Sequence, residues 1–132
     1  MTGASFPVET VGGVPVVAAP DEIDITNAGV LRAALLQAAA HGNGTLVVDM
    51  SRTQFCDSAG LNVLVRAHKR AEAQGGEVLL VISRDAVLRI FAVTGIDRLI
   101  PNFASLEEAM RFLRRTGDFA GTAVPHERTR SR

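Results

Sequence analysis

The sequence predicts an α/β domain with a mixed, mostly parallel β-sheet, an N-terminal hairpin and about four helices. Three observations favour this fold. Gly12-Gly13 separates two short apolar runs near the N-terminus. Two further apolar runs, 45–49 and 78–82, are bounded by turn residues, as expected for buried strands. Each of these is followed by a segment with helical spacing, which is typical of parallel strands joined by helical crossovers.

The hairpin is expected over residues 7–11 and 14–19, as two edge-type strands, because glycine tolerates the positive φ of a tight turn. Thr26 or Asn27 is then expected to cap a first helix, which stops at 41–44. Its apolar residues recur at helical spacing and are Val30, Leu31, Ala34, Leu35 and Ala38.

The run 45–49 is predicted to be a central strand buried on both faces. A second helix is expected to start at Ser58 and to end at Gly75-Gly76. Its inward side is predicted to carry Leu61, Leu64, Val65 and His68, and its other side Asn62, Arg66, Lys69 and Arg70.

The run 78–82 repeats the pattern of a buried strand. Asp85 or Ser83 is expected to cap a third helix that ends before Gly95, and residues 99–101 are expected to add a brief strand. Ser105 and Glu108 have the spacing of a capping box, which predicts a last helix up to Gly117. The apolar residues of these two helices are Val87, Leu88, Phe91, Ala92, Ala109, Met110, Phe112 and Leu113.

Length and composition indicate one domain. The chain has 132 residues, 47% of them hydrophobic, which is enough for a core without metals or disulfides. We expect the domain to cover residues 6–117. Residues 118–132 are expected to form a disordered basic tail, because they carry no periodic apolar face whose burial would offset the entropy of ordering them.

Charge and cysteine content exclude several classes of function. The 14 acidic and 14 basic side chains balance, so no overall field attracts nucleic acid or an anionic membrane. No apolar run reaches the roughly 18 residues of a membrane span. Cys56 is the single cysteine, and the N-terminus shows no secretion signal. We expect a cytoplasmic protein without a metal or cofactor.

Ser58 is the candidate functional residue, because it lies where a buried strand turns into a helix, the side of an open α/β sheet where ligands bind. It has two interpretations. Its hydroxyl oxygen can cap the helix by accepting from the N–H of Gly60 or Leu61. Alternatively, Ser58 accepts a phosphate, since Asp57, Ala59 and Gly60 leave the turn open to a kinase.

The residues around this turn resemble a known family. Asp49-Met50-Ser51, followed by the run from Phe55 to Leu61, resembles the signature of anti-sigma-factor antagonists, the bacterial STAS domains. Asp21-Glu22-Ile23-Asp24 is similar to the family's Gly-Glu-Leu-Asp, and Val93-Thr94-Gly95-Ile96 to its Leu-Thr-Gly-Leu. The resemblance spans residues 8–115 and implies a STAS-like fold. Pro20 and Ala59 depart from the family pattern without removing the acceptor hydroxyl.

The resemblance implies a regulatory binding protein and not an enzyme. In such antagonists, the serine at the position of Ser58 is phosphorylated by a partner that is both anti-sigma factor and serine kinase, and a PP2C-type phosphatase removes the phosphate. The unphosphorylated antagonist binds the kinase and releases the sigma factor. The alternative within the family is a scaffold in a stress-sensing or lipid-transport complex that does not use the serine as a switch.

Seven residues are expected to contact the partner. Asp24 is carried over by the resemblance and is expected near Ser58; its alternative role is a loop or helix cap. Asn62 and Arg66 follow Ser58 by four and eight residues, so they extend its side of the helix as a ridge, or form a solvated polar face. Val63 beside them is the expected apolar contact. The full set is Asp24, Asp57, Ser58, Ala59, Asn62, Val63 and Arg66.

Three other readings are weaker. Cys56 has the position of a buried apolar residue, with a redox-sensitive thiol as the alternative. A serine hydrolase is disfavoured, because no Gly-x-Ser-x-Gly elbow surrounds Ser58 and none of His41, His68 and His126 is evidently its base. The glycines at 42–44 precede a strand, whereas a phosphate-binding loop follows one, so they form a turn.

Overall fold

A computed structural model gives the structure of the chain and describes residues 6–117. The predicted tail, 118–132, lies outside the described residues. The elements, in chain order, are β1 (Val8–Val11), β2 (Val14–Ala18), β3 (Glu22–Ile23), α1 (Ala28–His41), β4 (Leu46–Met50), β5 (Phe55–Cys56), α2 (Ser58–Ala73), β6 (Val78–Ile82), α3 (Asp85–Thr94), α4 (Ile96–Leu99), β7 (Asn102–Phe103) and α5 (Leu106–Gly117).

The main sheet has five strands in the order β1-β2-β4-β6-β7. β1 and β2 pair antiparallel, and the other neighbours pair in parallel. The mixed sheet and its hairpin are thereby confirmed, with β4 in the centre as predicted. Gly12 and Gly13 have φ of 57° and 83°, the positive values that a two-residue hairpin turn demands. β2 is not an edge strand, contrary to the prediction, because β4 pairs with its second side.

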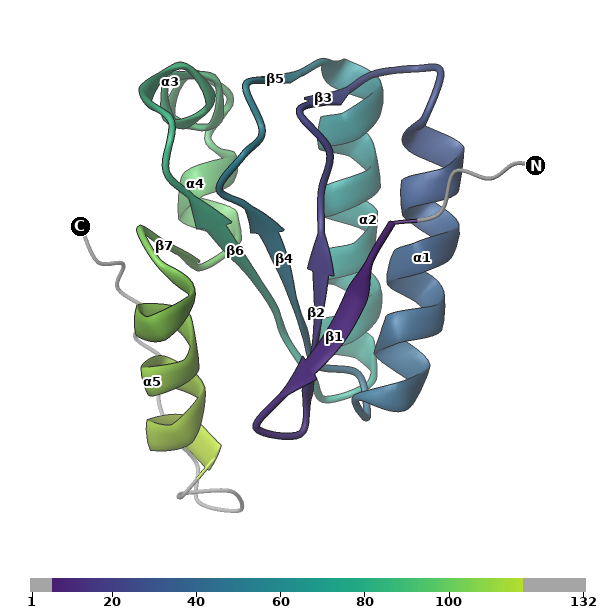
Figure 1. Cartoon of the computed structure of the whole chain (residues 1–132), viewed down its shortest axis with the longest axis vertical. Coiled ribbons are helices and arrows are strands. Elements are labelled where there is room, and N and C mark those ends of the chain that lie inside the picture. The colour runs from purple at the N-terminus through teal and green to yellow at the C-terminus, as the bar shows by residue number, and fades with distance from the viewer. Residues whose placement is uncertain (1–5, 118–132) are drawn as a thin grey trace.

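The core lies on both faces of the sheet, because successive strand residues point to opposite sides. Val48 and Leu80 belong to a large cluster with α1, α2, α3 and α4, whereas Val47 and Leu79 pack with α5. Figure 1 shows α5 apart from the pair α1 and α2, which run side by side. All of β6 is buried, which explains its continuous apolar sequence.

The region after α3 differs from the prediction of a strand at 99–101. Residues 96–99 form the short helix α4, so the described residues hold five helices and not about four. The Asn102 side-chain amide donates to the carbonyls of Asp97 and Ile100, both at 3.1 Å, and closes the turn after α4. Pairing with β6 then begins where the carbonyl of Pro101 accepts from the N–H of Leu80.

The structure shows which of the predicted residues cap α3 and α5. The hydroxyl of Ser105 accepts from the N–H of Glu108 at 3.2 Å, as predicted for α5. Neither predicted residue caps α3: Arg84 occupies the cap position without a side-chain hydrogen bond, Ser83 donates to the carbonyl of Ala104, and Asp85 is already the first helical residue. None of the described helices is long and apolar enough to cross a membrane.

Candidate functional site

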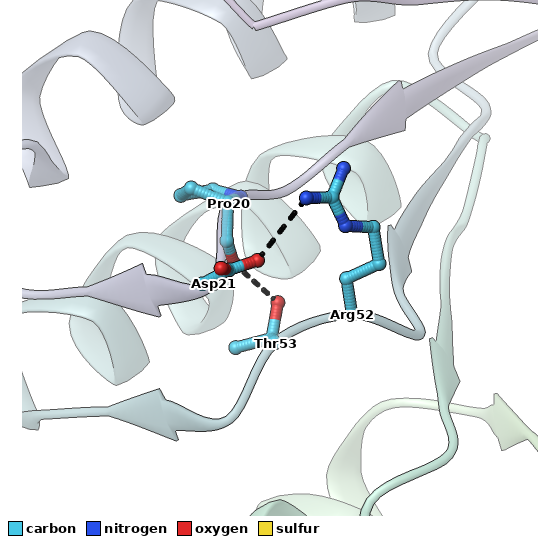
Figure 2. A network of polar contacts seen from close by, with 4 residues as sticks. All are labelled: Pro20, Asp21, Arg52 and Thr53. Carbon is cyan, nitrogen blue, oxygen red and sulfur yellow. Dashed lines mark hydrogen bonds and ion pairs between the residues drawn. The ribbon is translucent and has the colours of Figure 1, made fainter.

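The candidate site lies where β4, β5 and α2 follow one another, at the carboxyl end of the central strand. After β4, the chain turns through 51–54, and this turn is anchored on the segment that follows β2. The Thr53 hydroxyl, which is fully buried, donates to the carbonyl of Pro20 at 2.8 Å. Arg52 and Asp21 form an exposed ion pair at 3.4 Å (Figure 2). The two segments are therefore held together just before β5 and α2 begin.

β3 and β5 form a second, two-stranded parallel sheet, which joins the same two segments further along the chain. Ile23 pairs with Cys56, and the Asp57 N–H donates to the carbonyl of Ile23 at 3.0 Å. Asp24 directly follows β3, and Asp57 directly follows β5. The structure thus brings the segment of Asp24 beside the start of α2, as expected (Figure 1).

Asp57, and not Ser58, caps α2. The Asp57 carboxylate accepts from the N–H of Gly60 at 3.1 Å, and its backbone is extended, as is usual at a cap. The interpretation of Ser58 as the cap is therefore wrong. Ser58 is the first helical residue and is exposed, and its hydroxyl makes no hydrogen bond within residues 6–117. This hydroxyl is accessible and has no structural role there.

Gly60 sets the close approach of α2 to the small sheet. A Cβ at this position would lie 2.5 Å from Cγ2 of Ile23 and 2.7 Å from Sγ of Cys56. Any larger residue would push α2 away from β3 and β5. The neighbouring Ala59 is half-buried and packs against the core, so its side chain offers only part of its surface to a partner.

Cys56 is a core residue. Its side chain is 2% exposed, and burial, followed by the negative charge of Asp57, raises the pKa of the thiol to about 12. Since the thiolate is the reactive form, this environment suppresses redox chemistry. The interpretation of Cys56 as a small buried apolar residue is confirmed, and the alternative of a redox-sensitive thiol finds no support.

Asp24 organises the loop before α1. Its carboxylate accepts from the hydroxyl of Thr26 and from the N–H of Thr26, and the first of these hydrogen bonds is the main cause that lowers the pKa of Asp24. The Asp24 carbonyl accepts from the N–H of Ala28 at 2.8 Å. Asn27 sits at the predicted cap position, but its side chain binds Asp24 and Glu22 instead of the helix. The loop-capping role of Asp24 is therefore present, and its role in docking stays a prediction.

The ridge on α2 is partly as expected. Asn62 and Arg66 are exposed. Val63 is 7% exposed and belongs to the large core cluster, so it offers little surface for the partner contact expected from the sequence. The inward side of α2 consists of Gly60, Val63, Leu64, His68 and Ala71, while Leu61 and Val65 are half-buried at its margins.

Two apolar residues near the site were not singled out from the sequence. Ile25, which follows Asp24, is 76% exposed, and Phe55 in β5 is 46% exposed. A large apolar residue next to polar residues is the sequence signal that marks each of them, because polar neighbours indicate a solvent-facing segment. Exposed apolar surface beside an accessible hydroxyl suits contact with another protein.

The histidines and acidic residues of the described part of the chain form no cluster that could hold a metal ion. His68 is 6% exposed, and its Nε2 lies 3.6 Å from a carboxylate oxygen of Glu72, one turn away on the same helix. His41 bonds the carbonyl of Gln37 at the end of α1, and His126 lies outside the described residues. Residues 6–117 contain no group of three or more His, Cys, Asp or Glu side chains that could hold a metal ion.

Comparisons with known proteins agree with this arrangement. The model of the STAS domain matches residues 5–109. The chain is 34% identical over 86 residues to the anti-sigma-B factor antagonist of Bacillus subtilis, which covers 65% of this chain and 78% of the relative. It is 31% identical over 104 residues to the anti-sigma-F factor antagonist RsfB of Mycobacterium tuberculosis, covering 77% and 83%. The crystal structure of an anti-sigma factor antagonist from Mycobacterium paratuberculosis superposes with a TM-score of 0.76 at 30% identity, covering 83% and 93%.

Proposed function

The chain belongs to the STAS domain family, and we propose that it is an anti-sigma factor antagonist controlled by phosphorylation of Ser58. Unphosphorylated, it binds an anti-sigma factor that is also a serine kinase and thereby releases a sigma factor. The kinase phosphorylates Ser58 and ends the binding, and a PP2C-type phosphatase restores it. The protein acts in the cytoplasm as a binding partner and not as an enzyme.

This proposal rests on one observation at the start of α2, where Asp57 and Ser58 have different roles. Asp57 supplies the cap, so the Ser58 hydroxyl is exposed and makes no hydrogen bond in the described part of the chain. A kinase needs a hydroxyl that it can reach without unfolding its substrate. The relatives named as antagonists of anti-sigma factors support the same partner class.

A phosphate on Ser58 leaves the fold in place. At the start of α2, it meets the positive end of the helix dipole, an interaction of about 0.3–1 kcal/mol. The Asp57 carboxylate opposes this gain by like-charge repulsion. Because these local terms partly cancel, the effect of the phosphate falls on the contact with the partner.

The proposed docking surface surrounds Ser58 with exposed or half-buried groups. Asp24, Asp57 and Ala59 lie beside it, Asn62 and Arg66 extend it along α2, and Ile25 and Phe55 add apolar area. A phosphate of about −1.5 to −2 charges that is buried here without a cationic partner costs several kcal/mol. Since each 1.4 kcal/mol changes affinity tenfold, this cost suffices to release the partner.

The test is a titration of the cognate anti-sigma factor kinase, without ATP, against the wild type, Ser58→Ala and Ser58→Glu. We expect Ser58→Ala to bind like the wild type and Ser58→Glu to bind about tenfold more weakly or worse. Thr10→Glu is the matched control, because it adds the same charge on exposed β1, and it should bind within about twofold of the wild type. Equal binding of Ser58→Glu and the wild type would favour a scaffold without a serine switch.

A further inference from the structure

A small cavity of about 90 Å³ opens between α1 and α2, and its lining on α2 runs from Val63 to Ala71. Its apolar lining comes from both helices and from the start of β4, and includes Leu35, Leu46 and Val63. The cavity exists because alanines stand where the two helices face each other. Ala39, Ala67 and Ala71 line it, and none of them is large enough to fill the space.

Three arginines surround this cavity. Arg32 comes from α1, and Arg66 and Arg70 come from successive turns of α2. On each helix, the arginines and the apolar residues of the cavity recur at helical spacing. Each helix therefore presents a stripe of arginines and apolar residues to the other helix. Arg66, expected from the sequence to extend the contact around Ser58, is thus also part of this second feature.

The positive charge of these arginines is not neutralised locally. All three are exposed, and within residues 6–117 none of them forms an ion pair. α1 contains no acidic residue, and the one acidic residue of α2, Glu72, lies against His68. The chain as a whole has a formal charge of zero, so this cluster is a local excess and not a consequence of a basic protein.

We propose that this cavity and its arginines, the α1–α2 socket, bind an acidic segment of a partner protein that inserts one apolar side chain. The size of the cavity favours this occupant. Small-molecule sites typically have volumes of about 300–1,000 Å³, whereas one buried anchor side chain is the usual centre of a protein contact. Carboxylates that flank the anchor would meet the guanidinium groups in two-pronged hydrogen bonds.

The α1–α2 socket shares Arg66 with the proposed docking surface but lies apart from Ser58 itself. Ser58 is the first residue of α2, and Arg66 follows it by eight residues and Arg70 by twelve, so even the nearer of these arginines lies about 12 Å away along the helix axis. At that separation, water and salt screen most of the charge of a phosphate. The socket therefore holds its partner in both phosphorylation states, whether or not Ser58 is a kinase substrate.

The test uses short peptides added to the ¹⁵N-labelled protein, with backbone amide shifts as the readout. The probe is acetyl-Glu-Glu-Leu-Glu-Glu-amide. We expect it to shift the amides that line the socket and to bind about tenfold more tightly than the same peptide with alanine in place of leucine. The analogue with four lysines in place of the glutamates should not bind. Ser58→Glu should leave the affinity unchanged within about twofold.

Variants of the protein separate the cavity from the charge. Ala67→Leu fills the cavity, and the double variant Arg66→Gln/Arg70→Gln removes two charges. Each of these proteins should bind the probe peptide about fivefold more weakly, or worse. Lys69→Gln is the matched control, because Lys69 is an exposed cation of α2 outside the socket, and binding should stay within about twofold.

Two results would overturn the proposal. One is peptide binding that survives both the filled cavity and the loss of the arginines. The other is binding of hexanoate, followed by the shifts of the same amides, with an affinity as high as that of the peptide. That result would assign the socket to small anionic amphiphiles. Because phosphorylation of Ser58 is measured separately, failure here leaves the proposed function standing.

Discussion

Asp57 accepts the backbone hydrogen bond at the start of α2, and this leaves the neighbouring Ser58 hydroxyl exposed. This arrangement separates the structural role of Asp57 from the regulatory role that we propose for Ser58. If Ser58 were the cap, its modification would remove a hydrogen bond from the helix and couple the switch to stability. With Asp57 as the cap, the modification acts on the surface.

Replacement of Asp57 tests this division. Asp57→Ala should lower the free energy of unfolding by about 0.5–2 kcal/mol, because it removes the cap, whereas Asp57→Asn should cost less, since asparagine caps equally well. Urea unfolding followed by circular dichroism measures both. Ser58→Ala is the matched control and should change stability by less than about 0.5 kcal/mol. A larger loss of stability for Ser58→Ala than for Asp57→Ala would show that Ser58, and not Asp57, caps α2.

The pKa of Asp24 predicts a pH dependence. Hydrogen bonds from Thr26 lower the pKa of this carboxyl below its ordinary value of 3.8, so the folded state favours the charged form. This stabilisation is present above pH 3.8 and is lost as the pH falls through the lowered folded-state pKa. Asp24→Asn should therefore be less stable than the wild type near neutral pH and should approach it in strong acid.

Unfolding by urea at neutral pH and in strong acid, for the wild type and Asp24→Asn, checks this expectation. A stability difference that is the same at both pH values would assign the effect of the substitution to packing and not to the charge of Asp24.

At the scale of elements, the site depends on the contact of α2 with β3 and β5. Two-residue strands give no periodic signal, and so the sequence did not predict this small sheet. Its parallel pairing brings Asp24 beside Asp57. The resemblance to STAS domains implied that proximity, and the hydrogen bond from the Asp57 N–H to the Ile23 carbonyl gives it a physical cause.

Gly60→Ala should loosen this contact. The added methyl group would lie 2.5 Å from Cγ2 of Ile23, and such overpacking typically costs 1–3 kcal/mol, against roughly 1 kcal/mol gained from helix propensity. Gly29→Ala in α1 is the matched control, because a Cβ there meets nothing within 4 Å and should stabilise the protein slightly. Thermal unfolding of both variants measures the difference, and equal shifts for both would contradict the packing described for Gly60.

The elements with strong periodicity were predicted well, and those fixed by tertiary contacts were not. β6 and α5 follow their sequence patterns closely, because a continuous apolar run marks β6 and the Ser105 cap marks the start of α5 in the local sequence. The strand expected at 99–101 begins later, since Asn102 closes a turn after α4. Val63 was expected to contact the partner, but it belongs to the core cluster and lines the cavity between α1 and α2, and no pattern within α2 reveals the position of a neighbouring helix.

In the whole molecule, the two proposed binding features lie at different places along α1 and α2. The carboxyl end of the sheet carries the loops around Ser58, while α1 and α2 continue away from that end and form the α1–α2 socket further along (Figure 1). Core clusters pack on both faces of the sheet. We therefore expect a modification at Ser58 to leave this core in place.

Ser58 is the phosphate acceptor that we propose. Incubation with the cognate anti-sigma factor kinase and ATP, followed by intact-mass measurement and phosphopeptide mapping, tests this proposal. We expect the addition of a single phosphate, on the peptide that contains Ser58, and no addition to a folded Ser58→Ala variant. Phosphate on another residue, or incorporation that persists in Ser58→Ala, would contradict it.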